Sequence, residues 1–204
     1  MGYLFGTINP SYIISHAKGF DIRKRGSHNA GASNAVILMG KRIGIFCALI
    51  DILKACLAIA LAKKFFPDFR YACILTGAGC IVGHIFPYNM EFRGGKGLAC
   101  LGGMILMYDW RVFFIFLTAE IVIALITNYV CFVPITASAA FSITYGFLTR
   151  DIFGVIILTA ITCLIIYKHI ENIRRIKNGT EMRLSYLWNK DAEIKRLEKN
   201  DLQN

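Results

Sequence analysis

Long apolar segments separated by short polar ones constrain this chain more than any other feature of its sequence. The chain is 56% hydrophobic and 18% charged, and its apolar residues fall in blocks rather than at helical spacing. A helix needs about 20 apolar residues to cross a hydrocarbon core of about 30 Å. We therefore predict an all-α integral membrane protein with about seven transmembrane helices. The apolar blocks are 1–17, 43–62, 71–87, 98–108, 112–127, 130–148 and 152–167.

Two of these blocks, 1–17 and 98–108, are shorter than a full span. Either polar flanks extend them or they cross the membrane incompletely. The first block begins at Met1 without a basic leader, and no small-residue cleavage site follows it. We expect it to be the first structural helix rather than a removable signal peptide.

The distribution of basic residues predicts the orientation of the helices. With seven helices, the segments 18–42, 88–97 and 168–204 lie on one side, and they hold 6, 2 and 9 of the 23 lysines and arginines. Basic loops stay on the cytoplasmic side, so we expect the N-terminus outside and the C-terminus in the cytoplasm. The net charge of +10 then belongs to one face of a membrane protein. We expect no nucleic-acid partner, because the sequence contains no soluble module that interleaves basic and aromatic residues.

The sequence predicts one polytopic membrane domain over 1–183 and a polar cytoplasmic tail over 184–204. No internal repeat or low-complexity linker divides the chain. In the tail, apolar residues stand among charged ones, which suits a short helix on the membrane surface. A partly ordered, solvated end fits equally well. The apolar tail residues are Leu184, Leu187, Trp188, Ile194 and Leu197.

Three polar segments on the predicted cytoplasmic side carry groups that suit an anion. Residues 26–34 combine glycines with serine and asparagine, so backbone N–H groups can turn toward a phosphate, although an ordinary polar loop has the same composition. Residues 92–97 place Lys96 among glycines just before an apolar block, where a helix start favours phosphate. Residues 169–181 put His169 and Asn172 on one helix face. Their basic neighbours could equally anchor the helix to anionic lipid.

Other polar or reactive residues lie inside the apolar blocks. The seven cysteines show no C-x-x-C spacing, so we assign them to helix packing and expect no metal site. His84 is either a site residue or a satisfied packing histidine at a helix end. Charges within spans often mark transport paths, and Asp51, Lys54 and Glu120 are such charges. Asp51 and Lys54, at i and i+3, can instead pair with each other.

Together, the three polar segments resemble the motifs of the bacterial acyl-phosphate:glycerol-3-phosphate acyltransferase family, the PlsY type. The family motifs are G-S-G-N-x-G-A-T-N, then G-H-x-F-P followed by F-K-G-G-K-G, then H-x-x-N-I-x-R followed by G-T-E. The resemblance runs from about residue 3 to 183 and includes Asp51 and Lys54 in an L-D-x-x-K helix. The matching residues are Gly26, Ser27, Asn29, Gly31, Ala32 and Asn34, then Gly83, His84, Phe86, Pro87 and Phe92 to Gly97 with Arg93 for lysine, then His169, Asn172, Ile173, Arg175, Gly179, Thr180 and Glu181.

The resemblance implies a seven-helix enzyme of the bacterial inner membrane, with its active site facing the cytoplasm. Its reaction would move a fatty acyl group from acyl phosphate to the 1-hydroxyl of glycerol 3-phosphate, giving lysophosphatidic acid for phospholipid synthesis without a cofactor or metal. The proton of the hydroxyl would pass to a substrate phosphate, with His84 as a candidate base or acid. The implied catalytic residues are Ser27, His84, Lys96 and Asn172. The implied substrate-binding residues are Asn29, Gly31, Asn34, Gly94, Gly95, His169 and Glu181.

The departures from the family pattern that matter most fall on the acceptor side. Ile37 stands where the family has an arginine that contacts the acceptor phosphate, and Cys131 stands in a serine position. A charge-assisted hydrogen bond is worth roughly 1.5–3 kcal/mol. We therefore expect weaker acceptor binding unless Lys41, Arg42 or Lys177 compensates.

Three functions remain open at the level of sequence. The first is the acyl transfer to glycerol 3-phosphate that the resemblance implies. The second is an acyl-phosphate-dependent transfer to a different hydroxyl acceptor. The third is a non-enzymatic role as a transporter or lipid-binding protein, which the charges within the spans would favour.

Overall fold

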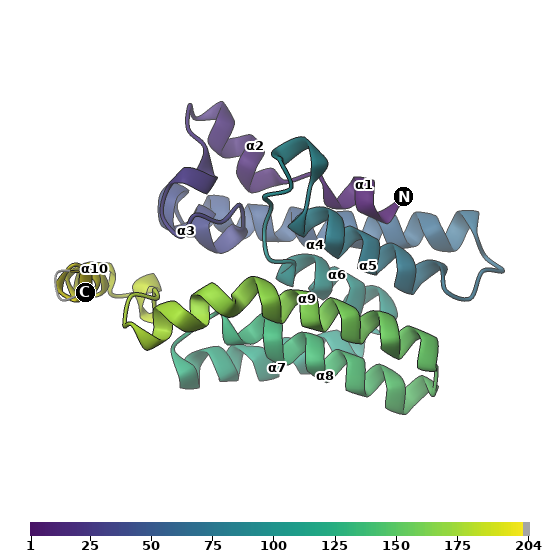
Figure 1. Ribbon diagram of the computed structural model, residues 1–204. Coiled ribbons are helices and arrows are strands. Elements are labelled where there is room, and N and C mark those ends of the chain that lie inside the picture. The colour runs from purple at the N-terminus through teal and green to yellow at the C-terminus, as the bar shows by residue number, and fades with distance from the viewer. Residues whose placement is uncertain (202–204) are drawn as a thin grey trace.

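All the regular elements over the residues that the structure describes are helices. The computed structural model describes residues 1–201, and within that range it contains no strand. Four helices are long and apolar enough to cross a membrane (Figure 1). They are α4 (Lys41–Phe65), α7 (Trp110–Thr127), α8 (Phe132–Thr149) and α9 (Ile152–Lys177). The prediction of an all-α membrane protein is confirmed. The apolar blocks match α4, α7 and α8 to within about three residues at each end, whereas α9 continues past the block that ends at residue 167.

Two shorter helices pack against α4. Helix α5 (Ala72–Ile85) and helix α6 (Leu98–Tyr108) both lie along it. At about 1.5 Å per residue, neither is long enough to cross the hydrocarbon core by itself. Their interior faces form the apolar core with residues of α8 and α9, including Ile81, Leu101 and Phe141.

The single helix expected over residues 1–17 is wrong. Helix α1 (Gly2–Gly6) ends before Asn9, and helix α2 (Pro10–Ala17) begins after it. The Asn9 side chain caps α2 by accepting a hydrogen bond of 2.9 Å from the N–H of Tyr12. Pro10 occupies the first turn of α2, where its missing N–H costs nothing. This cap and this proline start a new helix at a point where the apolar pattern alone predicts one continuous helix.

Helix α1 packs against α5 at backbone distance. A Cβ added at Gly6 would lie 2.2 Å from the carbonyl oxygen of Cys80, and one at Gly83 would lie 2.1 Å from that of Tyr3. Small residues at a helix crossing permit this approach, which is a common way to pack helices in membranes. The close contact fixes the end of α5 that carries His84.

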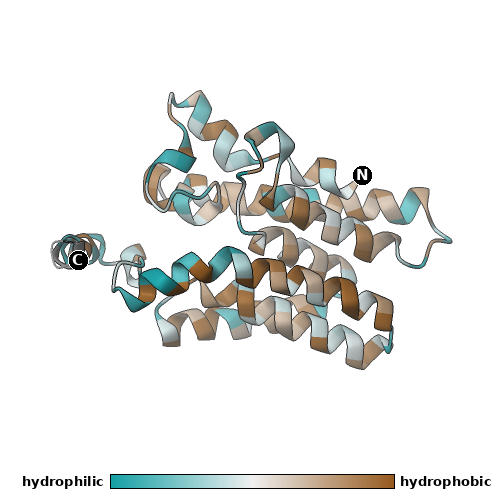
Figure 2. Cartoon of the chain, viewed as in Figure 1, coloured by the Kyte–Doolittle hydropathy of each residue, from teal (hydrophilic) through white to brown (hydrophobic). Residues whose placement is uncertain are grey.

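The outer faces of the long helices are apolar. Phe147 is 83% exposed and Ile126 is 79% exposed, and many other large apolar side chains share this exposure. Figure 2 shows apolar residues along the helices and polar residues gathered at one end of the molecule. A soluble protein rarely exposes so much apolar surface. These faces therefore suit lipid contact.

Short elements gather at the polar end of the bundle. Helices α2 and α3 (Ala32–Met39) lie there, with the 3-10 turns η1 (Ile22–Lys24) and η3 (Leu184–Leu187) and helix α10 (Lys190–Asp201) (Figure 1). The remaining turn, η2 (Tyr88–Met90), follows α5. The buried amide of Asn9 donates to the carbonyl of Ala30 at 2.8 Å, which ties α2 to the loop before α3.

Two charges predicted within a span are paired. Asp51 and Lys54 of α4 are 1% and 5% exposed, and their Oδ1 and Nζ atoms lie 2.7 Å apart. Lys54 also donates to the carbonyls of Gly6 and Ile8. The carbonyls at the break between α1 and α2 thus gain a hydrogen-bond donor from α4. The carboxylate of Asp51 neutralises the ammonium of Lys54.

Candidate active site

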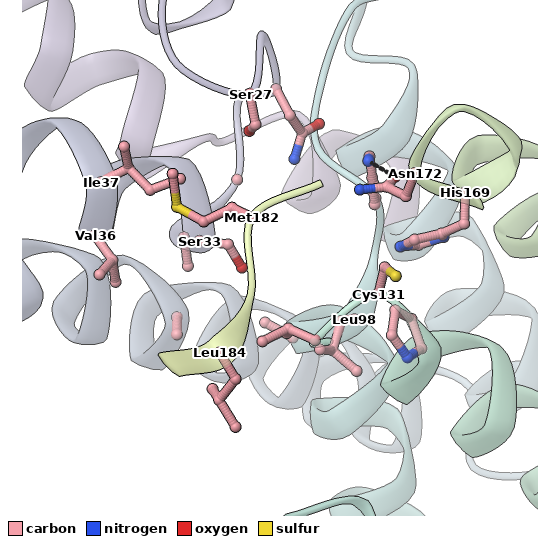
Figure 3. Close-up of a pocket in the computed structure, with 18 of the residues that line it drawn as sticks. Ser27, Ser33, Val36, Ile37, Leu98, Cys131, His169, Asn172, Met182 and Leu184 are labelled. Atoms are coloured by element: carbon pink, nitrogen blue, oxygen red, sulfur yellow. Dashed lines mark hydrogen bonds between the residues drawn. The ribbon is translucent and has the colours of Figure 1, made fainter. Parts of the chain in front are cut away.

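The three polar segments meet at a cavity of about 340 Å³ at the polar end of the bundle. Figure 3 shows side chains converging from α3, from the start of α8 and from α9. One part of the wall is polar and the other is apolar. The polar part includes Ser27, Asn29, Ser33, Lys96, His169 and Asn172. The apolar part includes Val36, Ile37, Leu98, Val130, Pro134 and Leu184.

Lys96 and the third polar segment are joined by a chain of hydrogen bonds. The ammonium of Lys96 donates to Oδ1 of Asn172, and the amide of Asn172 donates to Glu181 at 2.6 Å. The second oxygen of Glu181 accepts from Arg175 at 2.7 Å. Since Asn172 has its oxygen toward Lys96 and its nitrogen toward Glu181, both ends of its side chain are fixed. Two segments 76 residues apart are thereby brought to one wall.

Burial works against the charge of Lys96. Burial and the nearby guanidinium of Arg175 lower the pKa of Lys96 to about 8. The hydrogen bond to the neutral side chain of Asn172 does not offset the cost of burying the ammonium charge. An anionic ligand beside it would relieve this cost, because an opposite charge favours the ammonium.

The backbone N–H groups of Gly94 and Gly95 do not point as the glycine pattern suggested. The resemblance implied that Gly94 and Gly95 bind substrate, but their N–H groups donate to the carbonyls of Ile85 and His84, each at 3.0 Å. A Cβ on Gly95 would lie 2.1 Å from Nε2 of His84. These glycines therefore allow the loop to lie against the end of α5. The backbone that does line the cavity comes from Gly97, Leu98 and Ala99, where α6 begins without a side-chain cap.

The two predicted histidines present opposite hydrogen-bonding groups. Nδ1 of His169 lies 2.7 Å from the carbonyl of Ile165, and a carbonyl only accepts, so this nitrogen carries the proton. In the neutral ring, Nε2 of His169 is then an acceptor. Nδ1 of His84 lies 3.0 Å from the ammonium of Lys54 and 3.4 Å from Oδ1 of Asp51. When Nδ1 accepts from the ammonium, which only donates, the proton of the neutral ring is on Nε2. His169 can accept from a hydroxyl, and His84 can donate.

Asn34 organises the first polar segment from within. It is fully buried, and its amide nitrogen lies within 3.0 Å of the carbonyls of Ile22, Arg25 and Asn29. Its oxygen accepts from the N–H of Ser27 at 2.9 Å. These bonds hold the loop in a shape that places Ser27 and Asn29 on the cavity wall.

The structure brings most of the predicted site residues together. Eight of the eleven line the cavity, and three, Asn34, Gly94 and Gly95, lie behind it. The eight are Ser27, Asn29, Gly31, His84, Lys96, His169, Asn172 and Glu181. Each of the three behind the wall supports a residue that lines it.

Sequence reasoning missed the wall formed by residues 182–187. Figure 3 shows Met182 and Leu184 on a loop segment that crosses between α3 and the side carrying His169 and Asn172. Arg183 also lines the cavity. The proposed compensating residues Lys41, Arg42 and Lys177 do not line it. The available signal was the position of Arg183, two residues after the matched Glu181.

The two departures on the acceptor side, Ile37 and Cys131, both line the cavity. Ile37 contributes an apolar side chain from α3. The buried thiol of Cys131 is a weak hydrogen-bond donor. The two substitutions expected to alter acceptor binding therefore lie on the cavity wall itself.

Asp51, His84 and Cys100 form a buried cluster whose ligand atoms lie within 4.8 Å of one another. This grouping has the donor types of a metal site. However, the ammonium of Lys54 contacts both Asp51 and His84, at 2.7 and 3.0 Å. A metal cation there would face this positive charge. The residues therefore fit charge pairing at the cavity wall, which Asp51 and His84 line, better than metal binding.

The fold and the cavity define an integral membrane protein with an amphipathic pocket whose polar end suits an anion. Comparison with known proteins gives the family. The glycerol-3-phosphate acyltransferase model matches residues 1–179, and the chain belongs to that family.

Curated relatives and solved structures agree with this assignment. The "Glycerol-3-phosphate acyltransferase 1" of Oceanobacillus iheyensis is 38% identical over 202 residues, covering 94% of this chain and 96% of the relative. The glycerol-3-phosphate acyltransferase of Bacillus subtilis is 34% identical, covering 92% and 96%. A crystal structure of PlsY, an integral membrane glycerol 3-phosphate acyltransferase in its glycerol 3-phosphate form, is similar with a TM-score of 0.84 at 31% identity, covering 91% and 93%. Its lysophosphatidic acid form gives a TM-score of 0.79 at the same identity, covering 89% and 91%.

Proposed function

We propose that this protein is a membrane acyltransferase that moves a fatty acyl group from acyl phosphate to the 1-hydroxyl of glycerol 3-phosphate, giving lysophosphatidic acid for phospholipid synthesis. The observation that carries the proposal is the cavity, whose cationic, amide-lined end meets an apolar wall. A phosphate needs charge-assisted donors, while an acyl chain needs apolar contact. Relatives named for this activity and a similar structure in a glycerol 3-phosphate form support the choice of acceptor.

The reaction requires positioning more than covalent help from the protein. The hydroxyl oxygen of glycerol 3-phosphate attacks the carbonyl carbon of acyl phosphate. The bond from that carbon to the bridging phosphate oxygen breaks, and inorganic phosphate leaves with the proton of the hydroxyl. Since phosphate is a good leaving group, holding the reactants in line and stabilising charge supply most of the rate.

The cavity residues divide these tasks. Lys96 and Asn172 hold the donor phosphate, and Ser27 donates to it from the facing loop. The lone pair on Nε2 of His169 accepts a hydrogen bond from the acceptor hydroxyl. His84 also lines the cavity, and its Nε2–H is a further donor.

Other predicted site residues act by positioning. Asn34 shapes the loop of Ser27, while Gly94 and Gly95 let the Lys96 loop reach α5. Glu181 fixes the amide of Asn172. Asn29 and Gly31 remain on the wall as contacts to substrate.

We also propose a topology of seven membrane segments, with α1 and α2 forming an interrupted first one. The N-terminus lies outside: Gly2 packs against Thr76 near the start of α5, away from the cavity end. The C-terminus and the cavity lie at the basic end, which the positive-inside rule assigns to the cytoplasm. The membrane domain covers 1–183 and the cytoplasmic tail 184–204. A C-terminal tag should therefore be digested in inverted inner-membrane vesicles and protected in intact spheroplasts; the reverse pattern would overturn this topology.

The activity can be tested with protein reconstituted in vesicles. Palmitoyl phosphate and glycerol 3-phosphate should give lysophosphatidic acid and phosphate. Lys96→Ala and Ser27→Ala should abolish the transfer, whereas Cys163→Ala, an exposed residue away from the cavity, should leave it unchanged. Equal loss in all three variants would indicate misfolding and contradict the site assignment. Failure of the wild type to release phosphate with any acceptor would exclude this donor class.

A different hydroxyl acceptor is the second candidate, because Ile37 and Cys131 replace polar family residues on the cavity wall. A competition experiment among phosphorylated alcohols distinguishes a glycerol 3-phosphate acceptor from a different hydroxyl acceptor. If glycerol 3-phosphate is the acceptor, other phosphorylated alcohols should compete poorly with labelled glycerol 3-phosphate.

A transporter is not favoured by the charges within the spans. Asp51 pairs with Lys54, and Glu120 accepts a hydrogen bond of 2.7 Å from Thr136. Each of these charges therefore has a protein partner, as expected of charges that serve helix packing. Measured solute flux in vesicles that lack acyl transfer would reverse this ranking.

A further inference from the structure

The cavity must hold two anionic groups if the proposed function is correct. Acyl phosphate and glycerol 3-phosphate each bring one phosphate to the same space. A phosphate is normally bound by at least one charge-assisted donor. Among the residues that line the cavity, two are lysine or arginine, Lys96 and Arg183.

Lys96 is committed to one side of the cavity. It is tied to Asn172, and through Asn172 to Glu181. The neighbouring guanidinium of Arg175 is already paired with two carboxylates, Glu171 at 2.6 Å and Glu181 at 2.7 Å. The ammonium of Lys96 can therefore bind one phosphate, while the charge of Arg175 is already neutralised by its two carboxylate partners.

The backbone that carries Arg183 is firmly held. The N–H of Arg183 donates to Glu193 at 2.8 Å, and the next two N–H groups, of Leu184 and Ser185, donate to the backbone and side-chain oxygens of Asn128 at 2.7 and 2.9 Å. Asn128 ends α7 in the left-handed conformation. The segment is therefore anchored to the bundle directly beside the cavity.

Helix α10 braces this segment from the other side. Arg196 donates to the carbonyls of Gly179 and Glu181, at 2.5 and 2.7 Å, and pairs with Glu193 at 2.6 Å. Glu193 is 4% exposed and accepts from both arginines. Although burial opposes it, the hydrogen bonds from Arg196 and from the Arg183 N–H lower the pKa of Glu193. Residues 184–196 of the tail are thus a structural part of the cavity wall rather than a solvated end.

The guanidinium of Arg183, in contrast, is left available. It is exposed, and its one hydrogen bond among the described side chains is a long one of 3.5 Å to the hydroxyl of Tyr129. Within residues 1–198 no carboxylate forms an ion pair with it. A fixed backbone with a free planar cation is what recognition of a phosphate requires. We propose that Arg183 binds the phosphate of glycerol 3-phosphate and that Glu193 and Arg196 of α10 position it.

Steady-state kinetics of the reconstituted full-length protein can test this role. Arg183→Gln should raise the KM for glycerol 3-phosphate about tenfold or more, the loss expected for one charge-assisted contact, and leave the KM for palmitoyl phosphate unchanged. Arg183→Lys should recover part of the loss because it restores the charge. Arg196→Gln should shift the same KM in the same direction, since it releases the brace.

Lys195→Gln is the matched control, because Lys195 is an exposed cation on the same helix that lies away from the cavity. Neither KM should change in this variant. The inference is wrong if Arg183→Gln leaves the KM for glycerol 3-phosphate unchanged, or raises both KM values equally with no recovery in Arg183→Lys. These outcomes require an active wild type. A wild type that makes no lysophosphatidic acid would instead contradict the proposed function.

Discussion

The charge state of Lys96 should control the rate of the reaction with acyl phosphate. Its pKa of about 8 means that the ammonium is present below that pH and is lost as pH rises through it. We therefore predict that kcat/KM for acyl phosphate, which reports the free enzyme, falls as pH rises past about 8. Initial rates corrected for spontaneous hydrolysis measure this limb.

An arginine provides the control for that alkaline limb. Because a guanidinium keeps its charge at any pH used, the residual activity of Lys96→Arg should lack the limb. A wild-type profile that remained flat well above pH 8 would contradict the role of the Lys96 charge.

Ile37 tests the acceptor side at the same scale. An arginine introduced there would face the cavity from α3 and add a charge-assisted donor. Ile37→Arg should lower the KM for glycerol 3-phosphate by about tenfold if that phosphate binds nearby. Ile37→Gln, polar but uncharged, should lower it less. An unchanged KM in both variants would mean that another residue already fills this role or that the acceptor differs.

At the scale of elements, the loop before α6 depends on contact with α5. The Cβ of Gly95→Ala would collide with the His84 ring at 2.1 Å, so the loop and Lys96 must move. We predict that this variant loses most of its acyl transfer while remaining in the membrane. Gly102→Ala is the matched control, since its Cβ would lie 3.6 Å from the nearest atom, on Phe113. There alanine should stabilise the helix by about 1 kcal/mol. Equal activity in the two variants would show that loop position is unimportant.

The sequence predicted some elements well and others poorly, for physical reasons. Helices α4, α7, α8 and α9 follow from their apolar composition, which acts locally. The break at Asn9 depends on one cap and one proline within an apolar run. The direction of the Gly94 and Gly95 N–H groups depends on α5, which no local pattern reveals.

The candidate site follows the same division across the whole molecule. Motif residues such as Ser27, Lys96 and Asn172 were predicted to meet, and they line one cavity. The wall carrying Arg183 was missed because the bonds that place it join residues far apart, such as Leu184 and Asn128. The tail thus belongs to the site, whereas its composition suggested only a surface helix or a solvated end.

The central claim is that the whole molecule transfers an acyl group between two phosphorylated substrates in this cavity. The most direct measurement follows lysophosphatidic acid and inorganic phosphate together, in vesicles given palmitoyl phosphate and labelled glycerol 3-phosphate. We predict that the two products form in equal amounts and that Lys96→Ala stops both. Phosphate release without lysophosphatidic acid, or lysophosphatidic acid formation that persists in Lys96→Ala, would contradict it.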